Sequence, residues 1–365
     1  MILQEKVRAK GYELGASCYQ LANYALEDAD WFLSSVAKNG GTMSELFFNF
    51  TWQAGWQNAI FPIVKFAPDI DSNGNALFDG YEFPIWDINR FSSEKVKKWI
   101  EIFKLFAKYD LTLYLRIHDF CSLKDKFKNG HYPFQGRNVQ HEQGLYGGGM
   151  WWAWSADSDH PYGDPAKGKQ ITPYYRKALI KLIDMLTAAH TSYRLVMMNE
   201  ADYLADKDDS EKVRDGKVVL WHKWHIEALL GMGVKKDQII ISTSRALPQM
   251  AKWGYTMEIH GVNSPERLAE RQKTYAKIVP AKRFFPNGDG PDPYAKGRRG
   301  DAPTKREPSN VQARTIAVNL GESQIYAYFS RPCDTLGVHK MRARAMAQNI
   351  NYFNALKSLA QVVIR

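Results

Sequence analysis

Two acidic residues follow apolar segments at positions where carboxylates could do chemistry. Glu200 ends the apolar run that begins at Tyr193, and Asp289 follows the run that begins at Arg283. A pair of carboxyl groups can divide acid–base work, because one donates a proton while the other, ionised, attacks or activates water. We therefore treat Glu200 and Asp289 as a candidate pair of catalytic carboxyl groups. Glu258 is the alternative to Asp289, and is otherwise expected to be an ion-paired or hydrogen-bonded interior residue.

Each of these two assignments has a plainer alternative. Glu200 could be an ordinary carboxylate at a strand end, paired with a lysine. Asp289 lies in the sequence Asn-Gly-Asp-Gly, which is also a common turn sequence. The choice depends on the elements that position the two groups.

Eight short segments rich in apolar or β-branched residues are typical of strands. Helical patterns fill most of the intervals, and strands that alternate with helices predict a parallel sheet. We predict a single (β/α)8 TIM barrel domain over residues 1–365, whose chemistry lies at the carboxyl ends of the strands. The predicted strands are 14–20, 44–50, 111–118, 193–200, 238–244, 255–262, 282–288 and 324–330.

Helix boundaries are clearest in three places. Ser92 is a capping serine, and Glu94 lies in the first turn of the helix that it begins. Thr172-Pro173 puts a proline at the first position of a second helix. A third predicted helix, around 341–359, would close the ring.

The alternation of side chains along a strand predicts which of them face the barrel interior. In the segment 111–118 the polar set should point inward, with His118 nearest the mouth. The same rule puts His260 on one face with Glu258, so Glu200, His118, His260 and Asp289 should converge at one end. In the segment 111–118, the polar residues that share one face are Thr112, Tyr114, Arg116 and His118.

Two long connections, 51–91 and 120–172, follow the second and third strands and are rich in aromatic residues. Long loops in compact domains are usually functional, and exposed indole rings are costly unless something covers them. Sugar rings present apolar C–H faces that stack on flat aromatic rings. We predict that at least one of Trp52, Trp151 and Trp152 stacks on a sugar; the alternative is that these rings anchor the loops in small cores.

Over nearly its whole length the chain resembles clan A of the retaining glycoside hydrolases, which includes the family 5 cellulases and β-mannanases. That clan has an Asn-Glu pair at the end of strand four, and Asn199-Glu200 matches it in position and order. The segment 84–89, a helix and then 114–119 resemble the clan's second-to-third strand region, and His260 matches a histidine near strand six. The resemblance implies cleavage of a β-linked polysaccharide or oligosaccharide, with Glu200 as acid/base and Asn199 on the sugar 2-hydroxyl.

Strands seven and two depart from the clan's pattern. The clan's strand seven ends in a nucleophilic glutamate, but residues 283–290 contain no Glu. Asp289 is the nearest carboxylate and therefore the candidate nucleophile or base, although its side chain is one methylene shorter than that of a glutamate. Carboxyl groups ~5–5.5 Å apart favour retention and ~6.5–9.5 Å apart favour inversion, so the shorter side chain leaves both mechanisms open. The arginine of strand two is also missing, although Arg116 could supply its charge. A second hypothesis is therefore a glycan-binding barrel without catalysis, on a viral or cell surface, and a third is a barrel enzyme of another class.

Composition narrows the range of partners. The net charge of +10 suits an anionic partner, such as an acidic carbohydrate, although the densest basic stretch, 296–306, also fits a solvated loop. No nucleic-acid-binding motif is evident, and no segment approaches the ~20 apolar residues of a membrane span. We expect a soluble chain with no signal peptide, no nucleic acid partner and reduced thiols.

We expect no cofactor and no metal. Residues 69–74 resemble the start of a calcium loop, but its twelfth position is Gly80 rather than glutamate, which favours a plain turn. His222 and His225 lie three apart on a predicted helix, a spacing that can bind zinc, but the glutamate of the metalloprotease motif is missing. We therefore expect both histidines on a helix surface. For His118 and His260 we expect contacts with a sugar or a carboxylate.

Overall fold

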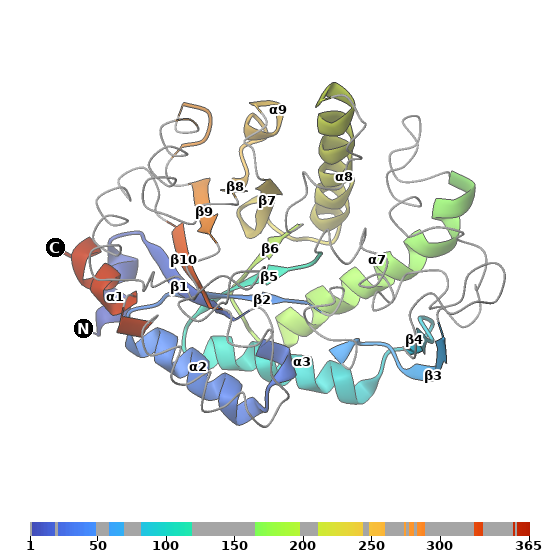
Figure 1. Cartoon of the computed structure of the whole chain (residues 1–365), viewed down its shortest axis with the longest axis horizontal. Helices are drawn as coiled ribbons and strands as arrows, with labels where there is room; N and C mark the ends of the chain where they lie inside the picture. Colours follow the sequence, from blue (N-terminus) through green and yellow to red (C-terminus); the bar gives the residue numbers. More distant parts are fainter. Residues whose placement is uncertain are drawn as a thin grey trace, which may run out of the picture.

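The computed structural model describes residues 2–18, 21–48, 58–68, 82–118, 165–197, 211–243, 248–259, 274, 277–280, 283–288, 325–330, 353–354 and 356–365. Within them, eight parallel strands form a closed α/β barrel (Figure 1). β10 pairs with β1 from Glu13 and Ile325 onward and so closes the ring. The strands are β1 (Glu13–Cys18), β2 (Met43–Phe47), β5 (Thr112–Arg116), β6 (Tyr193–Val196), β7 (Ile239–Thr243), β8 (Thr256–Ile259), β9 (Phe284–Gly288) and β10 (Ile325–Ser330).

Each of these strands overlaps one of the eight predicted segments, so the predicted barrel is confirmed at the level of its strands. The described helices are α1 (Leu3–Ala9), η1 (Leu21–Asn23), α2 (Leu26–Lys38), α3 (Ser93–Lys108), α7 (Pro165–Ala188), α8 (Glu211–Gly231), η6 (Lys236–Gln238) and α9 (Pro248–Ala251). Residues 356–363 are also helical, in agreement with the last predicted helix. None of the described helices has the length and apolar character needed to cross a bilayer.

The start of α3 agrees with the sequence. The Ser92 hydroxyl accepts a hydrogen bond from the backbone N–H of Lys95, as expected of a capping serine. Trp99 and Phe103, on the apolar face of this helix, are buried.

The start of α7 corrects the sequence prediction. This helix begins at Pro165, so Pro173 lies within it rather than at its first position. Pro165 is itself a proline at the first helical position, where the missing N–H would have had no partner in the helix. The connection after β5 is therefore shorter than the predicted 120–172.

The connection after β2 contains a hairpin that the sequence did not predict. β3 (Ile63–Pro68) and β4 (Glu82–Trp86) pair antiparallel, outside the barrel (Figure 1). Trp86 is fully buried and belongs to the main core, so it anchors this connection. Trp52, Trp151 and Trp152 lie outside the described residues, so stacking on sugar stays a prediction for them.

The core has two layers, one between strands and helices and one inside the barrel. Leu113 and Leu115 belong to the outer layer, whereas Tyr114 joins the inner cluster of Met43, Val196 and Ile240. This alternation along β5 confirms that Tyr114 faces inward. On the neighbouring strand, a Cβ at Gly15 would lie 2.0 Å from the Met43 carbonyl oxygen, so the approach of β1 to β2 requires glycine.

Candidate functional site

The carboxyl ends of the parallel strands lie at the same end of the barrel, which we call the mouth. β9 ends at Gly288, immediately before Asp289, and β8 ends at Ile259, immediately before His260. β6 ends at Val196, with Asn199 and Glu200 shortly after it in the chain. The described strands therefore lead to the mouth just before each predicted residue. Asn199, Glu200, His260 and Asp289 themselves lie outside the described residues.

A buried ion-pair group spans the interior of the barrel. Arg116 of β5 donates from Nη1 to Glu258 Oε2 of β8 over 2.8 Å, and from Nη2 to the other oxygen of the same carboxylate. The Arg116 Nη2 also donates to Glu45 Oε1 of β2 over 2.7 Å. β6 and β7 separate β5 from β8 in the ring, so the pair reaches across the barrel. We call Glu45, Arg116 and Glu258 the interior triad.

The interior triad is fully buried, with no exposed surface on any of its three side chains. A guanidinium that binds a carboxylate through two nitrogens is geometrically specific, and a buried charge depends on such partners. The prediction that Arg116 points inward is confirmed, as is the interpretation of Glu258 as an ion-paired interior residue. Burial of both side chains favours support of the strands over direct contact with a ligand.

His118 lies elsewhere than predicted. Its Nε2 forms a hydrogen bond with the Tyr175 hydroxyl of α7, and its ring contacts Trp221 and His225 of α8. β5 ends at Arg116, so the alternation of the strand does not extend to His118, whose ring contacts the helices α7 and α8. Burial lowers the pKa of His118 to about 3, which keeps the ring neutral.

The two helix histidines also differ from the prediction, because both are buried. His222 and His225 each lie with Nδ1 within 2.9 Å of the carbonyl oxygen four residues earlier, which accepts a hydrogen bond from the ring. Trp221 stacks on His225 with ring centres 3.8 Å apart, since this face of α8 packs inward. Burial is the main cause that lowers the pKa of His225 well below its usual value. Within the described ranges no three His, Cys, Asp or Glu side chains are grouped as metal ligands would be.

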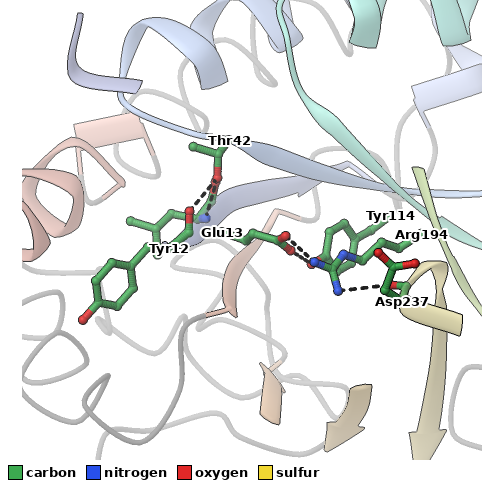
Figure 2. Close-up of polar contacts among 7 residues, drawn as sticks. Tyr12, Glu13, Thr42, Tyr114, Arg194 and Asp237 are labelled. Carbon is green, nitrogen blue, oxygen red and sulfur yellow. Dashed lines mark hydrogen bonds and ion pairs between the residues drawn. The ribbon is translucent and has the colours of Figure 1, made fainter. Parts of the chain in front are cut away.

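A second polar group, which the sequence did not predict, lies at the amino ends of the strands (Figure 2). Glu13 accepts hydrogen bonds from the Tyr114 hydroxyl and from Arg194 Nη2. Arg194 Nη1 also donates to the Asp237 carbonyl over 3.3 Å. Burial, and next the charge of Glu13, raises the pKa of Tyr114 well above its usual value. We call Glu13, Tyr114 and Arg194 the amino-end cluster.

Glu45 of the interior triad was missed as well, although the sequence carried a signal for it. It shares one face of β2 with Met43, which lies in the inner apolar cluster. The alternation rule applied to this strand would have placed Glu45 inside the barrel, in reach of an inward-facing arginine.

No protein-family model matches the sequence, and no curated protein matches it either. Solved structures with a similar fold include several from glycoside hydrolase family 5. A family 5 xyloglucanase from Paenibacillus pabuli has a TM-score of 0.54 at 8% identity, over 98% of this chain and 99% of that chain. A family 5 enzyme from Prevotella bryantii, in complex with a xyloglucan tetradecasaccharide, has a TM-score of 0.51 at 9% identity, over 100% and 99%.

Two further structures have comparable scores. A broad specificity endoglucanase from an uncultured bacterium has a TM-score of 0.52 at 10% identity, over 99% of this chain and 96% of that chain. A longer structure from Bacteroides vulgatus has a TM-score of 0.51 at 14% identity over 93% of this chain, which spans only 57% of its length. At these identities the likeness establishes the fold, an α/β barrel like those of family 5.

Proposed function

We propose that this protein is a glycoside hydrolase that cleaves a β-linked polysaccharide or oligosaccharide at the mouth of the barrel. The observation that carries the proposal is that Asn199-Glu200 follows β6, the fourth strand of a closed barrel whose fold matches family 5 enzymes. Several of those structures are named for action on polysaccharides, and one contains a bound xyloglucan fragment. Such a barrel concentrates side chains at the carboxyl ends of its strands.

The proposed chemistry divides between two carboxyl groups. Glu200 protonates the leaving oxygen, and ionised Asp289 attacks the anomeric carbon or activates a water. Asn199 contacts the sugar, and so does His260, which follows the inward-facing Glu258 by two residues. Trp52, Trp151 and Trp152 supply flat faces on which sugar rings stack.

The interior triad supports this site from within the barrel. Arg116 is the last residue of β5, and Glu258 is the last but one of β8, which leads directly to His260. The two-nitrogen contact between them fixes these strand ends relative to each other. Arg116 and Glu258 are therefore positioning residues in this proposal.

The first experiment replaces Glu200 by glutamine and measures sugar release from xyloglucan, mixed-linkage glucan and mannan. Loss of a general acid should lower the rate by about 10²- to 10⁴-fold, while oligosaccharide binding and the far-UV circular dichroism stay unchanged. The matched control is Glu227→Gln on the exposed face of α8, which should keep full activity. Full activity in Glu200→Gln would rule out Glu200 as the acid.

The second experiment tests Asp289 through Asp289→Asn with added azide. If Asp289 is the nucleophile, azide should restore turnover and give a glycosyl azide whose configuration is opposite to that of the normal product. If Asp289 activates water instead, the hydrolysis product of the wild type should have inverted configuration. An unchanged rate in Asp289→Asn would exclude both roles for Asp289.

One observation favours the second candidate function, a barrel that binds glycan without cleaving it. The residues of β9, Phe284–Gly288, contain no carboxylate, although the resembled clan has its nucleophile at the end of this strand. Micromolar binding of an oligosaccharide with no product after several days would favour this alternative over hydrolysis.

A further inference from the structure

A groove of about 480 Å³ lies on the outer surface, along α3 and facing α7. The two helices pack side by side in the helix layer (Figure 1). The apolar residues that line it are Phe91, Val96 and Ile100, all of which are only partly buried. Its volume falls within the ~300–1,000 Å³ of sites for small ligands.

Lysines line both sides of this groove. Lys97 and Lys104 belong to α3, and Lys181 belongs to α7. Glu101 is the only acidic residue of the lining, and Lys104 already pairs with it at 2.9 Å. Lys97 and Lys181 form no ion pair with the described part of the chain. The groove therefore carries an excess of positive charge above an apolar floor.

The spacing of the cations suits an extended ligand. Lys97 and Lys104 are two helical turns apart, about 10 Å along α3. Across the groove, the ammonium groups of Lys177 and Lys181 lie 5.4 Å and 5.8 Å from the centre of the Phe91 ring. That ring is held in place by Phe61, which stacks on it at 5.7 Å. A ligand that fits must carry repeated negative charges and an apolar face.

We propose that this groove binds an acidic oligosaccharide, with sugar carboxylates on Lys97 and Lys181 and the C–H face of a sugar ring on the apolar floor. A uronic acid polymer combines both properties in every residue. Inorganic phosphate would leave the apolar floor unused. The net charge of +10 also favours the encounter with a polyanion.

The site lies on the helix layer outside the barrel, so it does not depend on catalysis at the mouth. The test is calorimetric titration of the full chain with hexagalacturonate, and with neutral cellohexaose of the same length. Lys97→Glu with Lys181→Glu should weaken binding of hexagalacturonate by about tenfold or more. The matched control is Lys252→Glu with Lys357→Glu, which makes the same change in net charge at exposed positions elsewhere and should leave the affinity unchanged.

Hydrogen–deuterium exchange locates the ligand in the same samples. Hexagalacturonate should protect peptides that cover 91–104 and 177–184, and circular dichroism should show that both double variants remain folded. If both double variants bound hexagalacturonate equally weakly, the loss of affinity would come from the change in net charge alone, and the proposal would be overturned. Equal affinity for cellohexaose, displacement by equimolar inorganic phosphate, absence of binding, or protection confined to other peptides would overturn it as well.

Discussion

The two ends of the barrel interior hold ion pairs of the same residue types in different surroundings. In the interior triad, Arg116 binds Glu45 and Glu258, and no part of these side chains is exposed. In the amino-end cluster, Arg194 binds Glu13, and the two side chains remain 22% and 25% exposed (Figure 2). Water can solvate the amino-end pair if it separates, whereas the interior triad depends on its protein partners.

This difference agrees with a general property of such barrels: residues at the amino ends of the strands contribute to stability, and residues at the carboxyl ends carry the chemistry. Apolar side chains could fill the place of a buried ion pair with equal or greater stability. An arginine between two glutamates toward the mouth is therefore better explained by positioning of the strand ends. The amino-end cluster needs no such explanation, because partial exposure lowers the free energy cost of its charges.

The largest effect should come from Arg116→Met, which removes the guanidinium and leaves two buried carboxylates beside each other. The free energy of unfolding should fall by about 3–5 kcal/mol, because these carboxylates lose their charged partner without gaining water. Urea denaturation followed by circular dichroism measures it directly. The variant should also lose activity if the triad positions the mouth.

The control for Arg116→Met adds Glu45→Gln and Glu258→Gln. Neutral amides need no counter-charge, so the triple variant should recover part of the lost stability. Recovery of stability without recovery of activity would separate positioning from simple structural support. A loss below about 1 kcal/mol in the single variant would mean that burial does not distinguish the two ends.

The strands were predictable because buried parallel strands are continuous apolar runs. A run such as Tyr193–Val196 can be recognised in the sequence without any knowledge of tertiary contacts. The hairpin β3–β4 was not predictable in the same way, since both of its segments, Ile63–Pro68 and Glu82–Trp86, mix a charged residue and a proline with the apolar ones. The start of α7 depended on a choice between Pro165 and Pro173, which are both suited to a first helical turn.

The site was predictable only as far as the strand alternation reaches. Tyr114 and Arg116 lie within β5 and face inward as predicted, whereas His118 lies two residues past the end of that strand. For His222 and His225, spacing along the helix indicates that they are neighbours but not which face of α8 packs inward. That choice depends on partners such as Tyr175 from another helix.

A smaller effect is expected from acid, because the buried His118 after β5 should make the free energy of unfolding depend on pH. The pKa of His118 is about 3 in the folded chain and near 6.5 in an unfolded one, so the unfolded state binds more protons between these values. Stability is therefore lost as the pH falls below about 6.5, by about 1.4 kcal/mol per pH unit for this group. Between pH 7 and pH 5, wild type should lose about 2 kcal/mol more than His118→Gln.

Urea denaturation at the two pH values measures this difference. The substitution to glutamine also alters the hydrogen bond to Tyr175, but that effect is present at both pH values and drops out when each protein is compared with itself. His190→Asn serves as the control, because His190 is exposed and its positive φ of 51° tolerates asparagine. It should keep the acid sensitivity of the wild type. An unchanged loss in His118→Gln would show that His118 does not cause this sensitivity.

The smallest effect should come from Arg194→Met in the amino-end cluster. Glu13 keeps the Tyr114 hydroxyl and gains water, since its side chain is already 25% exposed, so the cost should be about 0.5–1 kcal/mol. Partly exposed pairs are screened by salt, so the gap between wild type and variant should narrow in 0.5 M sodium chloride, whereas that for Arg116→Met should not. A cost for Arg194→Met equal to that for Arg116→Met, and insensitive to salt, would mean that contact geometry rather than exposure decides the strength of both groups.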